Sequence, residues 1–242
     1  MMTEPEMKAL LDRLAQFRRS AWIPETVDGE GAADASRFAG RPAVRAGEEW
    51  PRCGHCGRPM QLFLQLNARD LPPEGARRLA GGILQLFYCT NYEAECDVEC
   101  EGWAPFSRCS LARLLPAGEA VAAPAGSPDG MFPPARIVRW AETADYPNVE
   151  ELEALGVALK DEEYDLWADG DFPLAGEKLL GWPYWVQGIE YPECPECGLR
   201  MEMLFQVDSE GHLPFMFGDS GVGHVTRCPE HPAVLAFGWA CC

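Results

Sequence analysis

The sequence predicts an α+β protein that is mostly β, built from two pseudo-symmetric zinc-knuckle modules around a shared core. The first observation behind this fold class is an internal repeat. Residues 40–66 align with residues 181–207 at a constant offset of 141 without a gap, and ten of the 27 positions are identical. Unrelated segments would share about two. The second observation is that each copy carries C-x-x-C-G followed by a run of period two, which is typical of a strand.

The identical positions include both cysteines of each C-x-x-C pair, together with turn residues and one glutamine. They are Gly40, Pro42, Gly47, Glu49, Pro51, Cys53, Cys56, Gly57, Met60 and Gln65, matched by Gly181, Pro183, Gly188, Glu190, Pro192, Cys194, Cys197, Gly198, Met201 and Gln206. The similarity resumes at residues 82–89 and 221–228, now at an offset of 139. We therefore interpret the chain as an internal duplication.

In each copy, one face of the strand after the cysteine pair is expected to be core. These core positions are Met60, Leu62, Leu64 and Leu66 in the first copy and Met201, Met203, Phe205 and Val207 in the second. The opposite face is mixed, because Phe63 and Leu204 are flanked by polar residues. We expect these two side chains to pack under a neighbouring loop; the alternative is a partly exposed recognition surface.

The remaining segments divide the chain into four parts. Residues 1–37 are predicted to form an amphipathic helix from Thr3 to about Ser20, with Thr3 and Glu6 as a capping box, and then a polar connector over 21–37. Residues 38–115 form the first β module. Residues 116–177 form a Pro/Ala/Gly-rich exposed linker and an acidic helical crossover, in which Asn148 and Glu151 indicate a helix cap and Leu152 and Leu155 an inward face. Residues 178–242 form the second β module.

Eleven cysteines in a chain without a secretory signal indicate metal ligation rather than disulfides. The N-terminal residues are acidic where a signal peptide would be basic and then apolar, so we expect a cytoplasmic protein. No stretch approaches the length of apolar residues that spans a membrane.

Each module is expected to hold one structural zinc ion, because a C-x-x-C pair supplies two ligands and a closed zinc site needs four. In the second module the C-x-x-H pair of Cys228 and His231 completes a site with Cys194 and Cys197; Cys241 or Cys242 could replace His231. In the first module Cys89 joins Cys53 and Cys56, and Cys96 is preferred as the fourth ligand over Cys100 and Cys109. With all positions filled by protein groups, about two structural zinc ions per chain are expected.

Two motifs favour catalysis only weakly. The sequence CGHC occurs in thiol oxidoreductases, but there the pair begins a helix, whereas here a strand follows. The run Gly218–Gly221 resembles a serine-hydrolase turn without an evident triad. No catalytic constellation is recognised, so we do not expect an enzyme. The alternative is an enzyme of unknown type with a site near Asp208, Asp219, His212 and His224.

The net charge of −18 constrains the partners. Between Glu142 and Glu177 there are 12 acids and one base, Lys160. Such a surface repels a phosphate backbone, so a nucleic-acid-binding zinc ribbon is disfavoured. The acidic region is either a solvated surface or a docking face for a basic protein. We expect no membrane partner, and the sequence leaves the oligomeric state open.

Several blocks resemble one family. WPRCGHCGRPMQLFLQL, GGILQLFYC, LLGWPYWVQG, CPECGLRMEMLFQVDS and FMFGDSGVGHVTRCPEHPAVLAFGWACC are similar to the bacterial YwqG-like proteins, a domain of unknown function. That family is related to eukaryotic programmed cell death protein 2 and its yeast counterpart, which act in ribosome biogenesis as chaperones for a ribosomal protein. The resemblance implies a β-rich fold with internal pseudo-symmetry and a protein-binding role, and it supplies no catalytic residues. Together these observations predict a zinc-containing protein-binding module, a chaperone or escort for a basic client.

Overall fold

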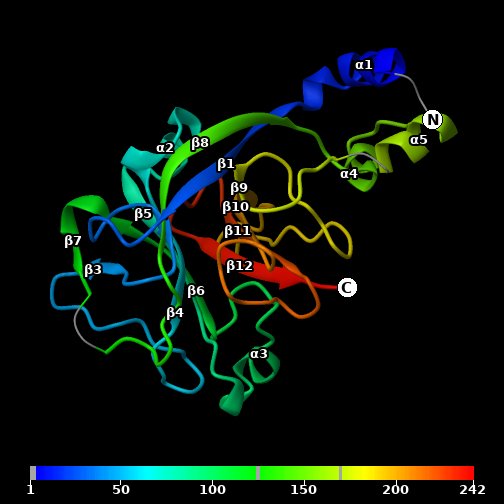
Figure 1. Ribbon diagram of the computed structural model, residues 1–242. Coiled ribbons are helices and arrows are strands. Elements are labelled where there is room, and N and C mark those ends of the chain that lie inside the picture. Colours follow the sequence, from blue (N-terminus) through cyan, green and yellow to red (C-terminus); the bar gives the residue numbers. More distant parts are fainter. Residues whose placement is uncertain (1–3, 124–125, 169–170) are drawn as a thin grey trace.

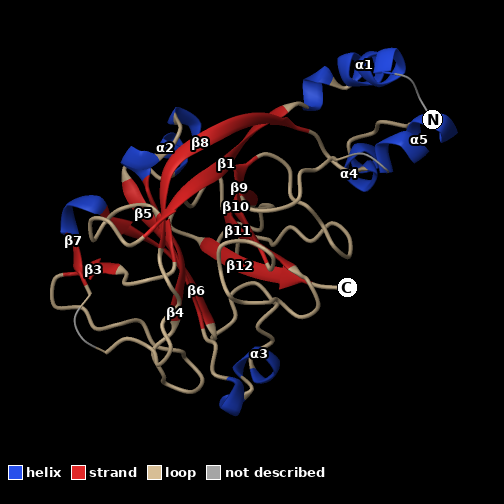
Figure 2. Cartoon of the chain, viewed as in Figure 1, coloured by secondary structure: helices blue, strands red, loops and turns tan. Residues whose placement is uncertain are grey.

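The computed structural model describes residues 4–123, 126–168 and 171–242 (Figure 1). Strands form the body of the molecule and helices lie at its periphery (Figure 2). The α-helices are α1 (Glu4–Arg13), α2 (Pro73–Arg78), α3 (Cys96–Glu99), α4 (Val149–Ala154) and α5 (Asp161–Ala168). The strands are β1 (Arg19–Asp28), β2 (Arg37–Phe38), β3 (Ala43–Arg45), β4 (Gln61–Asn67), β5 (Gly82–Tyr88), β6 (Ser110–Pro116), β7 (Ala120–Ala122), β8 (Ala135–Asp145), β9 (Lys178–Leu180), β10 (Glu202–Asp208), β11 (Val222–Arg227) and β12 (Leu235–Ala240). Short 3₁₀ turns occupy Ala15–Phe17, Ala68–Asp70, Tyr92–Ala94 and Ala117–Glu119.

Ten strands form one antiparallel sheet in the order β12-β11-β10-β9-β1-β8-β2-β4-β5-β6. The edge strands β6 and β12 lie against each other, so the sheet nearly closes on itself. Beside this edge the Trp239 N–H donates to the carbonyl of Trp103 at 3.0 Å. Strands β3 and β7 form a separate two-stranded sheet.

The sheet has the same strand order on both sides of its centre. Outward from the long central pair β1·β8, the order is β2-β4-β5-β6 on one side and β9-β10-β11-β12 on the other. The central strands are exchanged, because β1 pairs with β9 and β8 pairs with β2. Figure 1 shows β1 and β8 arching together across the molecule. Through this exchange β1, which is early in the sequence, belongs to the half of the sheet formed by β9 to β12.

Matching positions in the two halves have matching hydrogen bonds. The Gln65 amide accepts from the Ala43 N–H at 2.8 Å and donates to the carbonyls of Ala33 and Ala35 at 3.1 and 2.9 Å. Gln206 accepts from the Tyr184 N–H at 2.8 Å and donates to the carbonyls of Leu174 and Gly176 at 3.3 and 2.7 Å, in each case 141 residues later. The β4·β5 and β10·β11 ladders both shift register, between Leu62 and Leu64 and between Met203 and Phe205.

One hydrophobic core contains side chains of both halves, including the aromatic rings of β4, β10 and β12. Both residues whose burial the sequence left open belong to it: Phe63 is fully buried and Leu204 is 1% exposed. The Phe63 ring packs against Phe132 and Phe215, at centroid distances of 5.9 and 5.0 Å. Both positions are therefore buried as expected, and neither forms the partly exposed recognition surface that was the alternative.

Two predicted connections contain strands instead. The prediction of a connector over residues 21–37 is wrong, because β1 extends to Asp28 and buries Ala21 and Trp22. The crossover over 116–177 contains β7 and β8 as well as the expected helices. The partners of both central strands are far away in the sequence, so no hairpin turn indicates these strands.

The helices α1, α4 and α5 pack in a small cluster of their own. Leu10 and Leu14 of the N-terminal segment are buried with Leu152 and Trp167, so this segment packs on the protein as expected. Its helix ends at Arg13 and not near Ser20, because β1 begins at Arg19, and Thr3 of the predicted cap lies outside the described residues. The Asn148 side chain accepts from the Glu151 N–H at 2.8 Å, which confirms that cap. Leu155 was predicted to face inward but is 49% exposed, because the helix ends at Ala154. No helix in the described part of the chain is long and apolar enough to traverse a bilayer.

Candidate metal centres

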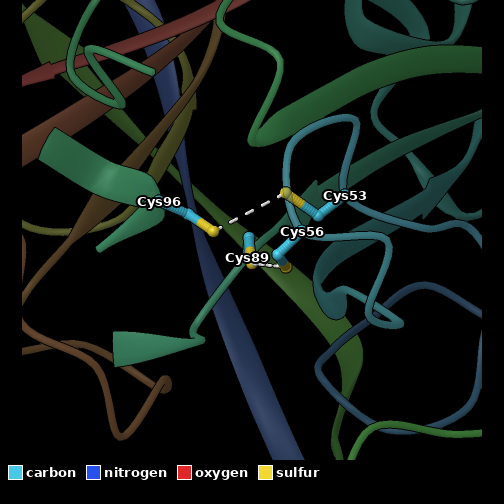
Figure 3. Close-up of side chains that lie close together, drawn as sticks. All are labelled: Cys53, Cys56, Cys89 and Cys96. Atoms are coloured by element: carbon cyan, nitrogen blue, oxygen red, sulfur yellow. Dashed lines mark hydrogen bonds between the residues drawn. The ribbon is translucent and has the colours of Figure 1, made fainter. Parts of the chain in front are cut away.

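Four cysteine side chains of the first half meet at one point (Figure 3). Cys53 and Cys56 come from the loop before β4, Cys89 directly follows β5, and Cys96 begins α3. The sulfur atoms of Cys53 and Cys96 are 3.9 Å apart and those of Cys56 and Cys89 are 3.7 Å apart. All four sulfurs lie within 4.8 Å of one another, so the group could hold a metal ion.

The knuckle loop is folded by its own backbone. The Cys53 N–H donates to the Arg58 carbonyl at 2.9 Å, and the Gly57 N–H donates to the Cys53 carbonyl at 3.0 Å. Gly57 has φ = 70°, a left-handed conformation that favours glycine. The His55 N–H points at the Cys53 sulfur at 3.4 Å. These contacts turn both thiols of the pair to the same side of the loop.

The second half brings together Cys194, Cys197, Cys228 and His231 in the same way. The Cys197 and Cys228 sulfurs are 3.6 Å apart, and the His231 Nδ1 lies 3.8 Å from Cys194 Sγ and 3.7 Å from Cys228 Sγ. The loop hydrogen bonds of the first knuckle recur, from the Cys194 N–H to the carbonyl of residue 199 at 2.9 Å and from the N–H of residue 198 to the Cys194 carbonyl at 2.8 Å. This group could also hold a metal ion.

The spacing of the donor atoms suits a small tetrahedral ion. Zn–S bonds of about 2.3 Å place the sulfurs of a tetrahedron about 3.8 Å apart. The sulfur–sulfur contacts of 3.6 to 3.9 Å lie at this value in both groups. The imidazole of His231 is further supported by the Glu196 carboxylate, which lies 3.5 Å from Nε2. Such a carboxylate orients a ligating histidine and raises its basicity.

The pKa values of the thiols differ within each group. Burial acts to raise the pKa of the Cys56 thiol, but the Arg58 N–H and its other hydrogen bonds prevail and lower it to about 7. Burial raises the pKa of Cys89 to about 12 and also raises that of Cys96. In the second group the N–H groups of residues 230 and 231 outweigh burial and lower the pKa of Cys228 to about 7. One thiolate thus forms first and opposes the ionisation of its neighbours, and a divalent cation would remove this opposition.

The alternative ligands lie outside both groups. Cys100 and Cys109 are absent from the first group, and the Cys109 sulfur is 3.3 Å from the Ser107 hydroxyl. Cys241 and Cys242, the alternatives to His231, are absent from the second group. The structure therefore brings together the ligand sets that the sequence preferred. No helix follows Cys56 as in thiol oxidoreductases, since the knuckle leads into β4.

Two residues of the alternative enzyme site, Asp208 and His212, contact the adjacent residues 176 and 177. The His212 Nδ1 contacts the Glu177 carboxylate, and its ring stacks on Phe38 at 4.7 Å. Asp208 accepts from the N–H groups of residues 176 and 210 at 3.2 and 2.9 Å, while Asp219 is exposed. His224 is buried beside Trp185, with 4.7 Å between ring centroids, and burial lowers its pKa to about 3.

An aromatic pocket of about 600 Å³, which was not among the predicted sites, lies beside β11 and β12. One wall is formed by Trp103 and Pro105, and the others by the segment from Trp185 to Pro192 and by the strands β11 and β12. His224 and Trp239 are contributed by these strands. The repeat alignment contains a usable signal, because Trp185 and Tyr191 of the pocket align with buried residues of the first module.

One family model, described as a domain of unknown function (DUF1963), matches residues 36–237. The matched range contains both cysteine groups and most of the residues that line the pocket, and it leaves out α1 and β1. No curated protein matches the chain.

Proposed function

Because the chain belongs to the DUF1963 family, a domain of unknown function, we propose from its own geometry that it is a protein-binding module whose halves each hold one structural zinc ion. The observation that carries the zinc is the pair of four-membered donor sets, each with all its ligand atoms within 4.8 Å. Sulfur-rich tetrahedral sets select zinc over the harder cations. With four protein ligands, the ion has no open position for water, so its role is structural.

The pseudo-symmetry of the molecule supports a duplicated origin. The knuckle, the strand that follows it and the strand that supplies the third cysteine recur in the same order on both sides of the β1·β8 pair. Each ion would join the knuckle loop to the end of β5 or β11. Structural zinc contributes about 10–16 kcal/mol of apparent binding free energy, which is ample for this role.

Protein binding is favoured by the charge and by the resemblance. The exposed acids of α4 and α5 give one region of the surface a strong negative charge, and such regions steer basic partners. The YwqG-like and programmed cell death protein 2 sequences that the chain resembles indicate a chaperone or escort role in the same direction. We propose a basic client protein bound in the cytoplasm.

The zinc proposal is tested by elemental analysis of purified protein, with two zinc ions per chain as the expected result. Folded protein that contains no bound metal would contradict it. The partner proposal is tested by immobilising the zinc-loaded protein and capturing ligands from a lysate at low salt. A basic protein identified in this way is then purified, and its Kd is measured at increasing NaCl. We expect the affinity to fall as ionic strength rises; a set of captured proteins none of which rebinds when purified would exclude a basic client.

A further inference from the structure

In the first half, the strand pair β3·β7 and the residues after it cover a cluster of apolar side chains. The strand β3 pairs with β7, with Val44 opposite Val121 and Ala43 opposite Ala122. The cluster beneath this pair contains Val44 at 1% exposed and Trp50 at 3% exposed, covered by the residues that follow β7. An extended segment of the chain thus both pairs with β3 and covers its apolar side chains.

In the second half the equivalent region is open. Residues 184–186 correspond to β3 at the offset of 141, and in the described part of the chain no strand pairs with them. Tyr184 is 38% exposed, whereas its counterpart Ala43 is fully buried. Trp185 and Tyr191, the counterparts of Val44 and Trp50, line the aromatic pocket instead of a sealed cluster.

Two side-chain differences enlarge the space. In the first half Arg113 of β6 stands opposite Gln85 and donates to it at 2.9 Å, with its guanidinium 5.4 Å from the Phe87 ring. In the second half Gly238 of β12 stands opposite His224, and Thr226 takes the place of Phe87. Both replacements are smaller, and both residues line the pocket.

The pocket wall also contains polar atoms that lack partners. His224 and Thr226 are 7% and 2% exposed, and neither His224 Nε2 nor Thr226 Oγ1 has a hydrogen-bond partner within the described residues. The other side of the His224 ring bonds to the backbone of Tyr184, as Gln85 bonds to the Ala43 carbonyl in the first half. The Nε2 of this neutral imidazole is therefore an acceptor. A buried polar atom without a partner costs free energy that a bound ligand can recover.

These features favour one class of occupant. A segment that lacks a strand partner and lies next to an apolar pocket is the arrangement that strand addition uses, in which main-chain bonds give affinity and a side-chain pocket gives selectivity. The rim carries the exposed acid Glu190, and the whole chain carries a charge of −18, so basic residues beside the bound segment are favoured.

We propose that the aromatic pocket binds an extended peptide segment of a partner protein, which pairs with residues 184–186 as β7 pairs with β3 and inserts an apolar side chain into the pocket beside Trp185 and Tyr191, whose rings pack edge to face at 4.8 Å. This inference rests on the proposed protein-binding function and assigns that function a site. The ligand is a segment with one aliphatic or aromatic anchor and basic neighbours.

The experiment selects 12-residue peptides from a random displayed library on the zinc-loaded full chain and measures Kd by fluorescence anisotropy. Thr226→Phe restores the residue found in the first half, and Gly238→Arg restores the arginine; each fills the pocket from within. Val138→Arg is the matched control, because Val138 lies on β8, is 49% exposed and does not line the pocket. Zinc content and thermal unfolding verify that each variant is folded.

We expect selected peptides with an apolar anchor and basic neighbours, at least tenfold weaker binding to both pocket variants, and unchanged binding to Val138→Arg. Failure to select any peptide, or equal affinity for Thr226→Phe and wild type, would overturn the inference. Retention of the basic partner by Thr226→Phe with unchanged Kd would also overturn it while leaving the proposed function intact. Peptides that bind the pocket in a protein that captures no basic client would support the site and refute the client.

Discussion

At the scale of single residues, the spacing of the cysteines predicted the candidate metal ligands. A C-x-x-C-G pair has a local geometry that the sequence reveals, and the third ligands follow from the repeat, because Cys89 and Cys228 occupy matching ends of β5 and β11. The fourth ligand of the first site was the least determined, since Cys96, Cys100 and Cys109 are all within reach along the chain. Only the turn of α3, which places Cys96 inward, distinguishes them.

This distinction predicts the outcome of two serine substitutions. Cys96→Ser removes one of four ligands, so we expect the zinc content to fall from two ions to about one per chain when weak sites are removed with a mild chelator. Cys100→Ser leaves the ligand set complete and is expected to retain two ions. Equal zinc contents in the two variants would contradict the ligand set in the structure.

His224 contributes to the pH dependence of the free energy of unfolding. Its pKa in the folded protein is about 3, because burial disfavours the imidazolium, whereas the unfolded chain has a pKa near 6.5. Below pH 6.5 the unfolded state therefore binds more protons, and stability falls as the pH is lowered. Between pH 7.5 and 5.5 this group should cost about 1.4 kcal/mol.

The matched variant is His224→Gln, which keeps the hydrogen bond made by Gln85 in the first half but does not titrate. Urea unfolding at the two pH values measures the difference, and loss of zinc at acid pH affects both proteins alike. We expect wild type to lose about 1.4 kcal/mol more than the variant. Parallel losses in both proteins would show that His224 is not held neutral.

At the scale of elements, the knuckles, β4 and β10 were predictable and the exchanged strands were not. The alternation from Met60 and from Met201 indicates a strand because both copies show it. β1 and β8 belong to no aligned block, and each pairs with a partner whose register depends on the whole sheet. The same reason hides β7, whose pairing with β3 seals the first half and has no counterpart among the described residues of the second.

The junction of β8 with β9 gives a prediction at this scale. The Asp145 carboxylate at the end of β8 accepts from Lys178 Nζ at 2.9 Å and from the N–H groups of Tyr146, Leu174 and Trp182 at 3.0, 2.9 and 2.8 Å. Both side chains of the ion pair are fully buried. Asp145→Asn leaves an unpaired buried ammonium, so we expect a loss of about 3–5 kcal/mol in the free energy of unfolding.

Two further variants separate the charge from the fold. Asp145→Asn combined with Lys178→Met removes both charges and should be less destabilised than Asp145→Asn alone. Glu25→Gln breaks the ion pair with Arg139, which is exposed at both side chains, and should leave the free energy of unfolding nearly unchanged. If the double variant unfolds as readily as the single one, the four hydrogen bonds of the carboxylate rather than the buried charge hold this junction.

At the scale of the whole molecule, the charge acts on stability and on binding in opposite directions. A net charge of −18 on 242 residues destabilises the compact state by self-repulsion, while the same field would attract the basic client that we propose. Salt screens both effects, because the Debye length falls from about 10 Å at 0.1 M to about 3 Å at 1 M. The same addition of NaCl should therefore raise the melting temperature of the free protein and weaken its complex.

This opposition is measured by following both quantities from 0.1 to 1 M NaCl. The matched variant neutralises four exposed acids of the helical cluster, with Glu150→Gln, Glu153→Gln, Asp161→Asn and Glu162→Gln. Because less repulsion remains to be screened, its melting temperature should be higher at 0.1 M and should rise less with salt, and its affinity for the client should be lower at 0.1 M. A variant that gains stability but binds the client as wild type does would place the attraction elsewhere on the surface, with the rim of the aromatic pocket at Glu190 as the next region to neutralise.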